Sequence, residues 1–230
     1  YIFYAAWNPP FVLLLWASTI VDWFIARGIW ASRDRSRAVR RSWLVISVAV
    51  NIGFIAFFKY GEFLLQNWQA LMQSFGVVWV APEWDIVLPV GISFYTFVTL
   101  SYTLDVYLGR SKPIDSRLDY ALFVTFFPHL VAGPSVRPTQ LVPQFYAPKQ
   151  ATRDTMLWGL GLIVLGLFMK VVLADAGLAN VTDRVFAATS AVGFADAWLG
   201  TLAFSGQIFC DFAGYSTIAV GTALCLGFAL

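Results

Sequence analysis

The chain has 230 residues, of which 59% are hydrophobic, 17% aromatic and only 12% charged. A soluble domain of this size needs roughly twice that share of charged residues to cover its surface, so the composition excludes a soluble protein and predicts an integral membrane protein. The net charge of +2 is too small to indicate a nucleic-acid partner, and the lipid bilayer is the expected surrounding.

Apolar stretches of membrane-spanning length follow one another along the chain. A helix needs about 20 mainly apolar residues to cross the hydrocarbon core of a bilayer. Four stretches meet or approach this length, at residues 11–26, 43–65, 86–108 and 156–173. A fifth, 197–230, is apolar but is interrupted by Asp211 and Gly214, which predicts two helices or one broken helix. The sequence thus predicts an all-α, multi-pass protein in which residues 1–230 form a single membrane domain, and we expect this domain to be truncated at both ends.

Basic residues alternate between the loops. The first loop carries six arginines, Arg27, Arg33, Arg35, Arg37, Arg40 and Arg41, whereas residues 66–85 carry no lysine or arginine. The positive-inside rule places the Arg27–Arg41 loop in the cytoplasm and residues 66–85 outside. The next loop, with Arg110, Lys112 and Arg117, is basic again, as a return to the cytoplasm requires.

Residues 118–133 have basic flanks on both sides, because Arg137, Lys149 and Arg153 follow them. Some 16 helical residues reach roughly 24 Å, which is short of a hydrocarbon core of about 30 Å. Pro128 removes a helix hydrogen bond, and Gly133-Pro134 is a helix stop. We therefore expect a re-entrant segment that enters from the cytoplasm and lines an internal cavity.

Charged residues inside apolar segments need partners. Lys59 and Glu62 are three residues apart and are expected to pair on one helix. Lys170 and Asp175 are expected near the membrane interface. Asp211 allows two interpretations: it marks a site beside a broken helix, or it caps the second half of that helix. Asp22 and Asp105 also require a partner or water.

His129 is the only histidine. Its ordinary pKa of about 6.5 suits a general base, but no second histidine exists to build a triad with Ser135, so a structural role beside Pro128 is favoured. Cys210 and Cys225 are interpreted as small apolar side chains. The sequence shows no metal-ligand cluster or nucleotide-binding loop, and the glycines of residues 159–166 favour close helix packing.

Four segments, in order, resemble the membrane-bound O-acyltransferase family and its bacterial branch that includes alginate O-acetyltransferase. They are LPVGISFYTFVTLSYTLDVYLGR at 88–110, FFPHLVAGPSVRPTQLVPQF at 126–145, MKVVLAD at 169–175 and QIFCDFAGYSTIAVG at 207–221. The resemblance implies a funnel-like multi-helix fold in a bacterial inner membrane. It also implies transfer of an acetyl group from a cytoplasmic thioester, such as acetyl-CoA, toward hydroxyl groups of an exported polysaccharide. An extracytoplasmic acyltransferase or polysaccharide-export proteins are the implied partners.

The family's catalytic histidine lies in a Trp-His motif downstream of the matched segments. The resemblance therefore implies no catalytic residue in this chain, and the 230 residues alone are expected to be inactive. The candidates for lining the donor path or cavity are His129, Arg137, Asp211 and Tyr215. His129 occupies a position that is His or Gln in the family, and Ala213 and Thr217 depart from the family pattern. Two alternatives remain open: a transporter or channel, and a non-catalytic scaffold of a surface-polymer export complex.

Overall fold

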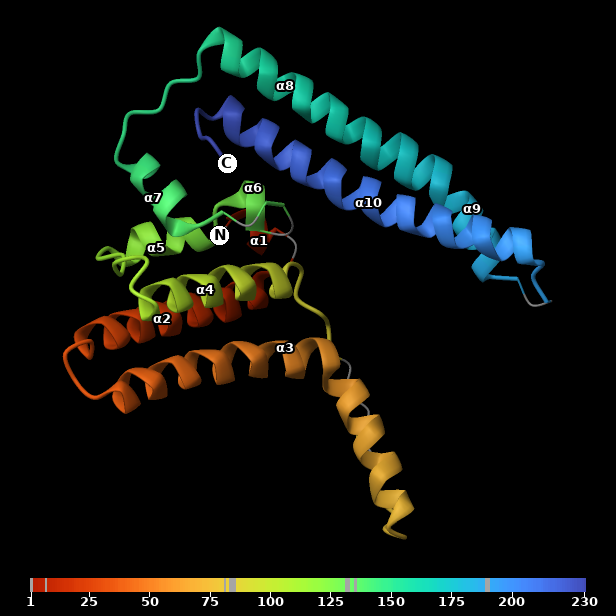
Figure 1. The fold of residues 1–230 in the computed structure, drawn as a ribbon, viewed down its shortest axis with the longest axis horizontal. Helices are drawn as coiled ribbons and strands as arrows, with labels where there is room; N and C mark the ends of the chain where they lie inside the picture. The colour runs from red at the N-terminus through yellow and green to blue at the C-terminus, as the bar shows by residue number, and fades with distance from the viewer. Residues whose placement is uncertain are drawn as a thin grey trace. The chain divides into compact units, whose positions relative to one another are not determined.

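The computed structural model describes residues 2–6, 8–80, 82, 86–130, 133–134, 136–188 and 191–230, with the side chains of Phe3 and His129 left aside. Over these ranges the chain is helical and has no strand, as predicted (Figure 1). Two compact units result, Tyr1–Thr125 and Phe126–Leu230, and each is described by itself. Among the described residues, four helices are long and apolar enough to span a membrane: Pro9–Ala31, Arg37–Ser74, Arg153–Phe186 and Phe194–Cys225.

In the part of the first unit that the structure describes, the helices are α1 (Ile2–Ala5), α2 (Pro9–Ala31), α3 (Arg37–Ser74), α4 (Ile92–Tyr107) and α5 (Arg117–Val124). Pro9 and Pro10 suit the first turn of α2, where the amide hydrogens have no partner within the helix. Gly91 lies before α4 with φ of 75°, a left-handed conformation that favours glycine. Helices α2, α3 and α4 pack against one another, and Tyr95 and Tyr102 of α4 are buried among them.

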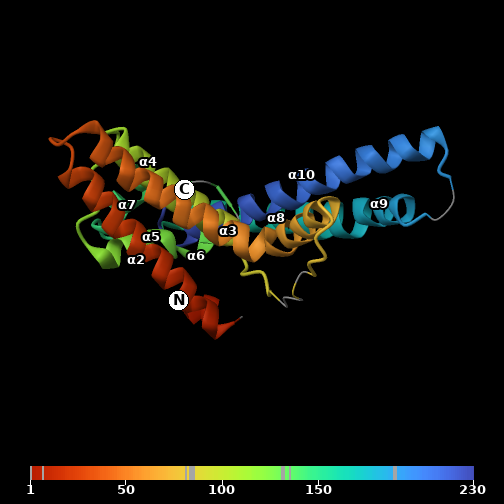
Figure 2. The same cartoon turned by 90° about the horizontal axis from the view of Figure 1, so that it is seen from below.

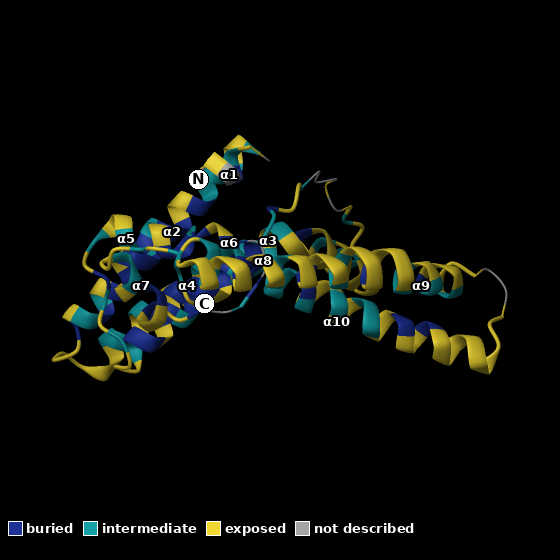
Figure 3. Cartoon of the chain, turned by 90° about the horizontal axis from the view of Figure 1, so that it is seen from above, coloured by how far each residue is buried: buried dark blue, intermediate teal, exposed yellow. Residues whose placement is uncertain are grey.

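The second unit is dominated by two long antiparallel helices. After the short helices α6 (Phe127–Leu130) and α7 (Pro138–Phe145), helix α8 (Arg153–Leu167) continues through the π-helix η1 (Phe168–Leu178) into α9 (Ala179–Phe186). Helix α10 (Phe194–Cys225) returns along this whole length, beside α8, η1 and α9 (Figures 1 and 2). Exposed residues cover much of α3, α8 and α10, as apolar membrane helices allow (Figure 3).

Glycines let the two long helices approach closely. A Cβ atom at Gly166 would lie 2.5 Å from the carbonyl oxygen of Gly214, and one at Gly221 would lie 2.5 Å from that of Gly159. Each helix thus presents two glycines seven residues apart to the other. The expected role of glycines 159 and 166 in close helix packing is confirmed.

The predicted spans 11–26, 43–65 and 156–173 lie inside long helices, whereas three boundary predictions are wrong. Helix α10 is continuous, so residues 197–230 do not form a broken helix. Helix α3 continues to Ser74, so the loop predicted from Gln66 begins later. The helix predicted over 86–108 begins only at Ile92, because Pro89 and the left-handed Gly91 precede it.

Residues 118–130 form two short helices rather than one, since α5 ends at Val124 and α6 begins at Phe127. Pro128 lies in the first turn of α6, which tolerates its missing amide hydrogen. Of the remaining positions, 131 and 132 lie outside the described residues. The re-entrant geometry stays a prediction.

Candidate functional site

An ion-pair cluster joins two of the segments that carry the family resemblance. The Lys170 ammonium lies 2.9 Å from a carboxylate oxygen of Asp175 and 2.7 Å from one of Asp211. Lys170 and Asp175 belong to MKVVLAD in η1, and Asp211 belongs to QIFCDFAGYSTIAVG in α10. Residues that are far apart in the sequence therefore meet in one polar group between two long helices.

The π-helix explains the pair within η1. A π-helix repeats its hydrogen bonds between residues five apart, so side chains at i and i+5 come close together. Lys170 and Asp175 have this spacing and form a hydrogen bond of 2.9 Å. Wide helical turns of this kind are frequent at functional sites.

The glycines described above bring Asp211 within reach of Lys170. A Cβ atom at Gly214 would lie 3.0 Å from the backbone nitrogen of Lys170 and 2.8 Å from the carbonyl oxygen of Gly166. At this contact the backbones of η1 and α10 are almost touching. Asp211, one turn before Gly214 on α10, can therefore pair directly with a side chain of η1.

One ammonium group serves two carboxylates, so the cluster carries one negative charge when all three groups are ionised. The three side chains are 35%, 51% and 51% exposed in the order Lys170, Asp175, Asp211. The ammonium has three N–H donors and uses two here, and the carboxylates retain free lone pairs. Chemically, the cluster can hold a hydroxyl or carbonyl group by hydrogen bonds, but it contains no nucleophile and base pair for acyl transfer.

The four candidate residues have different outcomes. Asp211 lies in the ion-pair cluster and is part of neither a helix break nor a helix cap, because α10 continues through it and Lys170 neutralises it. Tyr215 lies one turn further along α10 and is half-buried. Arg137 is exposed at the N-cap of α7. His129 belongs to α6, but its side chain lies outside the described part of the chain. Among the described residues, Arg137 makes no hydrogen bond or ion pair with the cluster.

Lys59 and Glu62 do not pair as predicted. The Lys59 ammonium lies 5.3 Å from the centre of the Tyr60 ring, and Glu62 instead accepts a hydrogen bond of 3.0 Å from Gln66. The neighbouring Gln66, four residues on, provides a neutral donor to this exposed carboxylate.

A second polar group lies within the first unit, around Asp22. The sequence predicted that Asp22 needs a partner, but it did not identify the partners. Asp22 of α2 is 1% exposed. Ser47 donates a hydrogen bond of 2.8 Å to one carboxylate oxygen, and Asn51 donates to both oxygens at 2.9 Å. Thr99 of α4 in turn donates to the Asn51 carbonyl oxygen at 3.1 Å. This chain of hydrogen bonds ties α2, α3 and α4 together.

Both polar groups left a signal in the sequence. Ser47 and Asn51 are four residues apart on α3, and the threonines 96, 99 and 103 follow helical spacing on α4. Each pattern places polar residues on one helix face that must be buried. For Lys170 and Asp211, the signal was a pair of opposite charges in consecutive apolar stretches, which a membrane protein brings together.

Proteins similar to this chain over nearly its whole length are described as O-acetylases or O-acetyltransferases. No protein-family model matches it. It is 40% identical to a protein of Pseudomonas aeruginosa described as probable alginate O-acetylase AlgI, over 99% of this chain and 43% of that protein. A protein of Azotobacter vinelandii with the same description is 39% identical over 99% of this chain and 45% of its own length. A peptidoglycan O-acetyltransferase of Helicobacter pylori is 32% identical over 96% of this chain and 46% of that protein.

The chain thus spans less than half the length of the relatives that it matches. Within that part the similarity is nearly continuous, and it runs through all four segments quoted above rather than through one motif. Together with the helical architecture, this confirms the resemblance seen in the sequence. Over 99% of its length, the chain is therefore similar to alginate O-acetylases, as its resemblance to the membrane-bound O-acyltransferases implied.

Proposed function

We propose that this chain forms part of an O-acetyltransferase in a bacterial inner membrane, which moves acetyl groups toward the hydroxyls of an exported polysaccharide. The observation that carries the proposal is the 40% identity, over 99% of the chain, to a relative described as an alginate O-acetylase. A second relative is described as a peptidoglycan O-acetyltransferase. Alginate and peptidoglycan are both glycans, so a glycan hydroxyl is the acceptor class that the two descriptions share.

The proposed donor is a cytoplasmic thioester, with acetyl-CoA as the simplest. In the transfer, the acceptor oxygen attacks the thioester carbonyl carbon, the new C–O bond forms and the C–S bond breaks. A base removes the hydroxyl proton, and the leaving thiolate takes up a proton. Transfer inside a helical membrane protein keeps the thioester from bulk water and limits hydrolysis. The base is the histidine that the resemblance places downstream of residue 230.

The residues of this chain have supporting roles in the proposal. The cluster of Lys170, Asp175 and Asp211 provides hydrogen-bonding groups between two apolar helices. Tyr215, one turn along α10, extends the same face with a hydroxyl group. Arg137, exposed at the N-cap of α7, is the proposed contact for the anionic donor. Extracytoplasmic acyltransferase or export proteins are the proposed partners that receive the acetyl group.

The test uses the complete gene product in membranes supplied with radiolabelled acetyl-CoA and a polysaccharide acceptor. We expect label to appear in ester linkage, released by mild alkali. Arg137→Ala should raise the KM for the donor with little change in kcat, because the contact is made before and during transfer alike. Arg153→Ala, which removes an exposed arginine at the start of α8, is the matched control.

Two outcomes would contradict the proposal or its parts. Flux of a substrate through proteoliposomes without covalent acetyl transfer would identify a transporter or channel instead. A broken helix over residues 197–230 was one argument for a transporter or channel, and the continuous helix α10 removes that argument. Acetyl transfer by residues 1–230 alone, abolished by His129→Ala, would show that the base lies within this chain.

A further inference from the structure

A basic cavity lies at the end of the first unit where α2 stops. Its volume is about 570 Å³, which is within the range of small-molecule sites. The lining includes three cationic side chains, one carboxylate and two large aromatic side chains: Arg27, Arg33, Lys112, Asp115, Phe24 and Trp30. The cations thus outnumber the carboxylate. None of these residues belongs to the ion-pair cluster around Lys170 or to the buried hydrogen-bonded group around Asp22.

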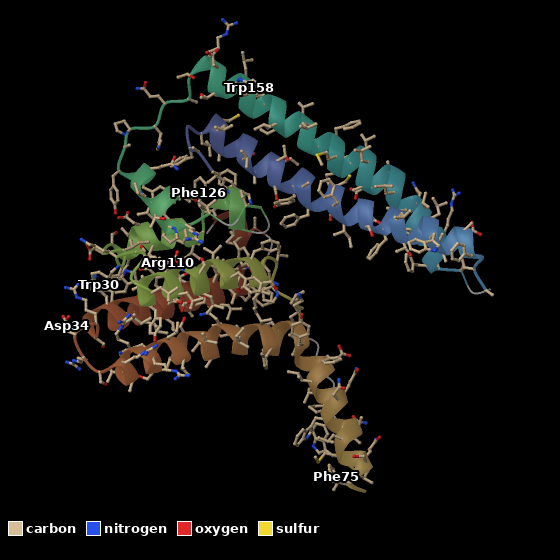
Figure 4. The ribbon with its side chains drawn as sticks, viewed as in Figure 1. Trp30, Asp34, Phe75, Arg110, Phe126 and Trp158 are labelled. Atoms are coloured by element: carbon tan, nitrogen blue, oxygen red, sulfur yellow. The ribbon has the colours of Figure 1, made fainter. Side chains whose placement is uncertain are left out.

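The loop after α4 is held against helices α2 and α4, and this contact builds the cavity. The Trp23 indole N–H donates a hydrogen bond of 2.9 Å to the carbonyl oxygen of Ile114, and the amide of Ile114 donates one of 2.9 Å to the Tyr102 hydroxyl. Arg27 lies 3.6 Å from a carboxylate oxygen of Asp115. The segment that carries Lys112 is therefore fixed beside the end of α2 (Figure 4, near Trp30 and Arg110).

The cations of the cavity keep donors for a ligand. The Lys112 ammonium makes no hydrogen bond or ion pair with any of the residues that the structure describes. The Arg33 guanidinium stacks over the Trp30 ring at 4.8 Å and lies 3.6 Å from Asp34, outside hydrogen-bond distance. Stacking holds the Arg33 side chain in place while its N–H groups stay available.

The charge and aromatic lining point to one ligand chemistry. Guanidinium forks and an ammonium suit the oxygens of a phosphate group. Tryptophan beside basic residues at the end of an apolar helix is typical of the headgroup level of a membrane. We propose that this cavity is a binding site for a phosphate-bearing anion, contacted by Arg33 and Lys112 and oriented by Arg27. The source of the phosphate is the headgroup of an anionic phospholipid or the phosphates of a soluble thioester donor.

The experiment measures ligand binding to the complete, detergent-purified protein. Three probes are titrated: short-chain phosphatidylglycerol, short-chain phosphatidylcholine as the zwitterionic comparison, and coenzyme A. Binding to the folded state raises Tm, from which Kd follows. Two variants are compared: the single substitution Lys112→Gln and the double substitution Arg33→Gln/Lys112→Gln. Lys112 lies in a loop, so its replacement does not disrupt a helix. The control is Arg35→Gln, which removes the same charge from the same loop outside the cavity.

Loss of each charged hydrogen bond is expected to raise Kd about tenfold or more. In the cavity variants, we expect this rise in the Kd of phosphatidylglycerol or of coenzyme A. The Arg35→Gln protein should bind the same anion with an unchanged Kd. Phosphatidylglycerol alone would assign the site to lipid, and coenzyme A alone to the donor. The proposed site is refuted if neither anion binds, or if phosphatidylcholine binds as tightly as phosphatidylglycerol. It is also refuted if the cavity variants bind the anion as tightly as the unmodified chain does, or if Arg35→Gln weakens binding as much as the cavity variants do. Acetyl transfer is not the readout, so the proposed function stands or falls separately.

Discussion

At Lys170, a single ammonium group serves two carboxylates, Asp175 from its own helix and Asp211 from α10. Replacing Lys170 with Met should cost more stability than replacing Asp211 with Asn. The first change leaves two carboxylates without a cation, and insertion scales give a cost of roughly 2.5–3.5 kcal/mol for such a charge at the centre of a membrane helix, which is an upper bound for these half-exposed groups. The second change leaves the pair of Lys170 and Asp175 intact. Thermal unfolding of the three proteins in detergent measures the order, and a smaller loss for Lys170→Met would contradict it. The Lys170→Arg variant, which keeps the charge, should retain most of the stability.

Asn51 offers a second test at this scale, because it donates to both oxygens of the buried Asp22. Asn51→Ala should destabilise the protein by about 2–4 kcal/mol, since it leaves a buried carboxylate with too few donors. Asn67→Ala is the control on the same helix, because Asn67 is exposed and donates only to the backbone carbonyl of Phe63. Equal unfolding temperatures for the two variants would show that the Asp22 group does not hold the helices together.

At the scale of the elements, the antiparallel pair of α8–η1 and α10 depends on glycines that face one another. Gly166→Ala places a methyl group 2.5 Å from the carbonyl oxygen of Gly214, so the helices must separate. We expect a loss of about 1–3 kcal/mol. Gly161→Ala is the matched control in α8, because nothing lies within 4 Å of its Cβ position. That variant should be neutral or slightly stabilising through helix propensity. Chemical unfolding monitored by circular dichroism distinguishes the two, and a tolerated Gly166→Ala would contradict the close contact.

Long apolar stretches predicted α2, most of α3 and the first part of the α8–η1–α9 helix, because hydropathy and length are local properties. The continuity of α10 was missed for a different reason. Asp211 and Gly214 each weaken an isolated helix, yet Lys170 neutralises the aspartate and the backbone of Gly166 packs against the glycine. Both compensations come from another helix, so no window along the chain contains them. The predicted pair of Lys59 and Glu62 was wrong for a local reason. The spacing allowed a pair, but the neighbouring Tyr60 and Gln66 provided other contacts.

For the whole chain, the contacts give a test of membrane topology. The turn after α2 and the segment after α4 lie at one end of the first unit, where Trp23 and Arg27 contact the segment that contains Ile114. The last residue of α3, Ser74, lies at the opposite end of that long helix (Figure 1). With Cys210 and Cys225 replaced by Ala, Arg35→Cys and Ser111→Cys should react with a membrane-impermeant maleimide from the same side, and Val78→Cys from the opposite side. Under the proposed orientation, the first two react only in inverted vesicles. Labelling of Arg35→Cys and Ser111→Cys from opposite sides would contradict the packing of α2 with α4.

The uneven charge of the ion-pair cluster also bears on how the second unit enters the membrane. The helix Arg153–Phe186 contains both Lys170 and Asp175, so it can neutralise its central charges by itself before any other helix is present. Helix α10 has Asp211 and, within its own sequence, no lysine or arginine to neutralise it. During synthesis, α10 therefore depends on the preceding helix for its cation, and the two are expected to insert as a hairpin in that order. A chain without Lys170 would leave the Asp211 carboxylate of α10 without a cation at this step.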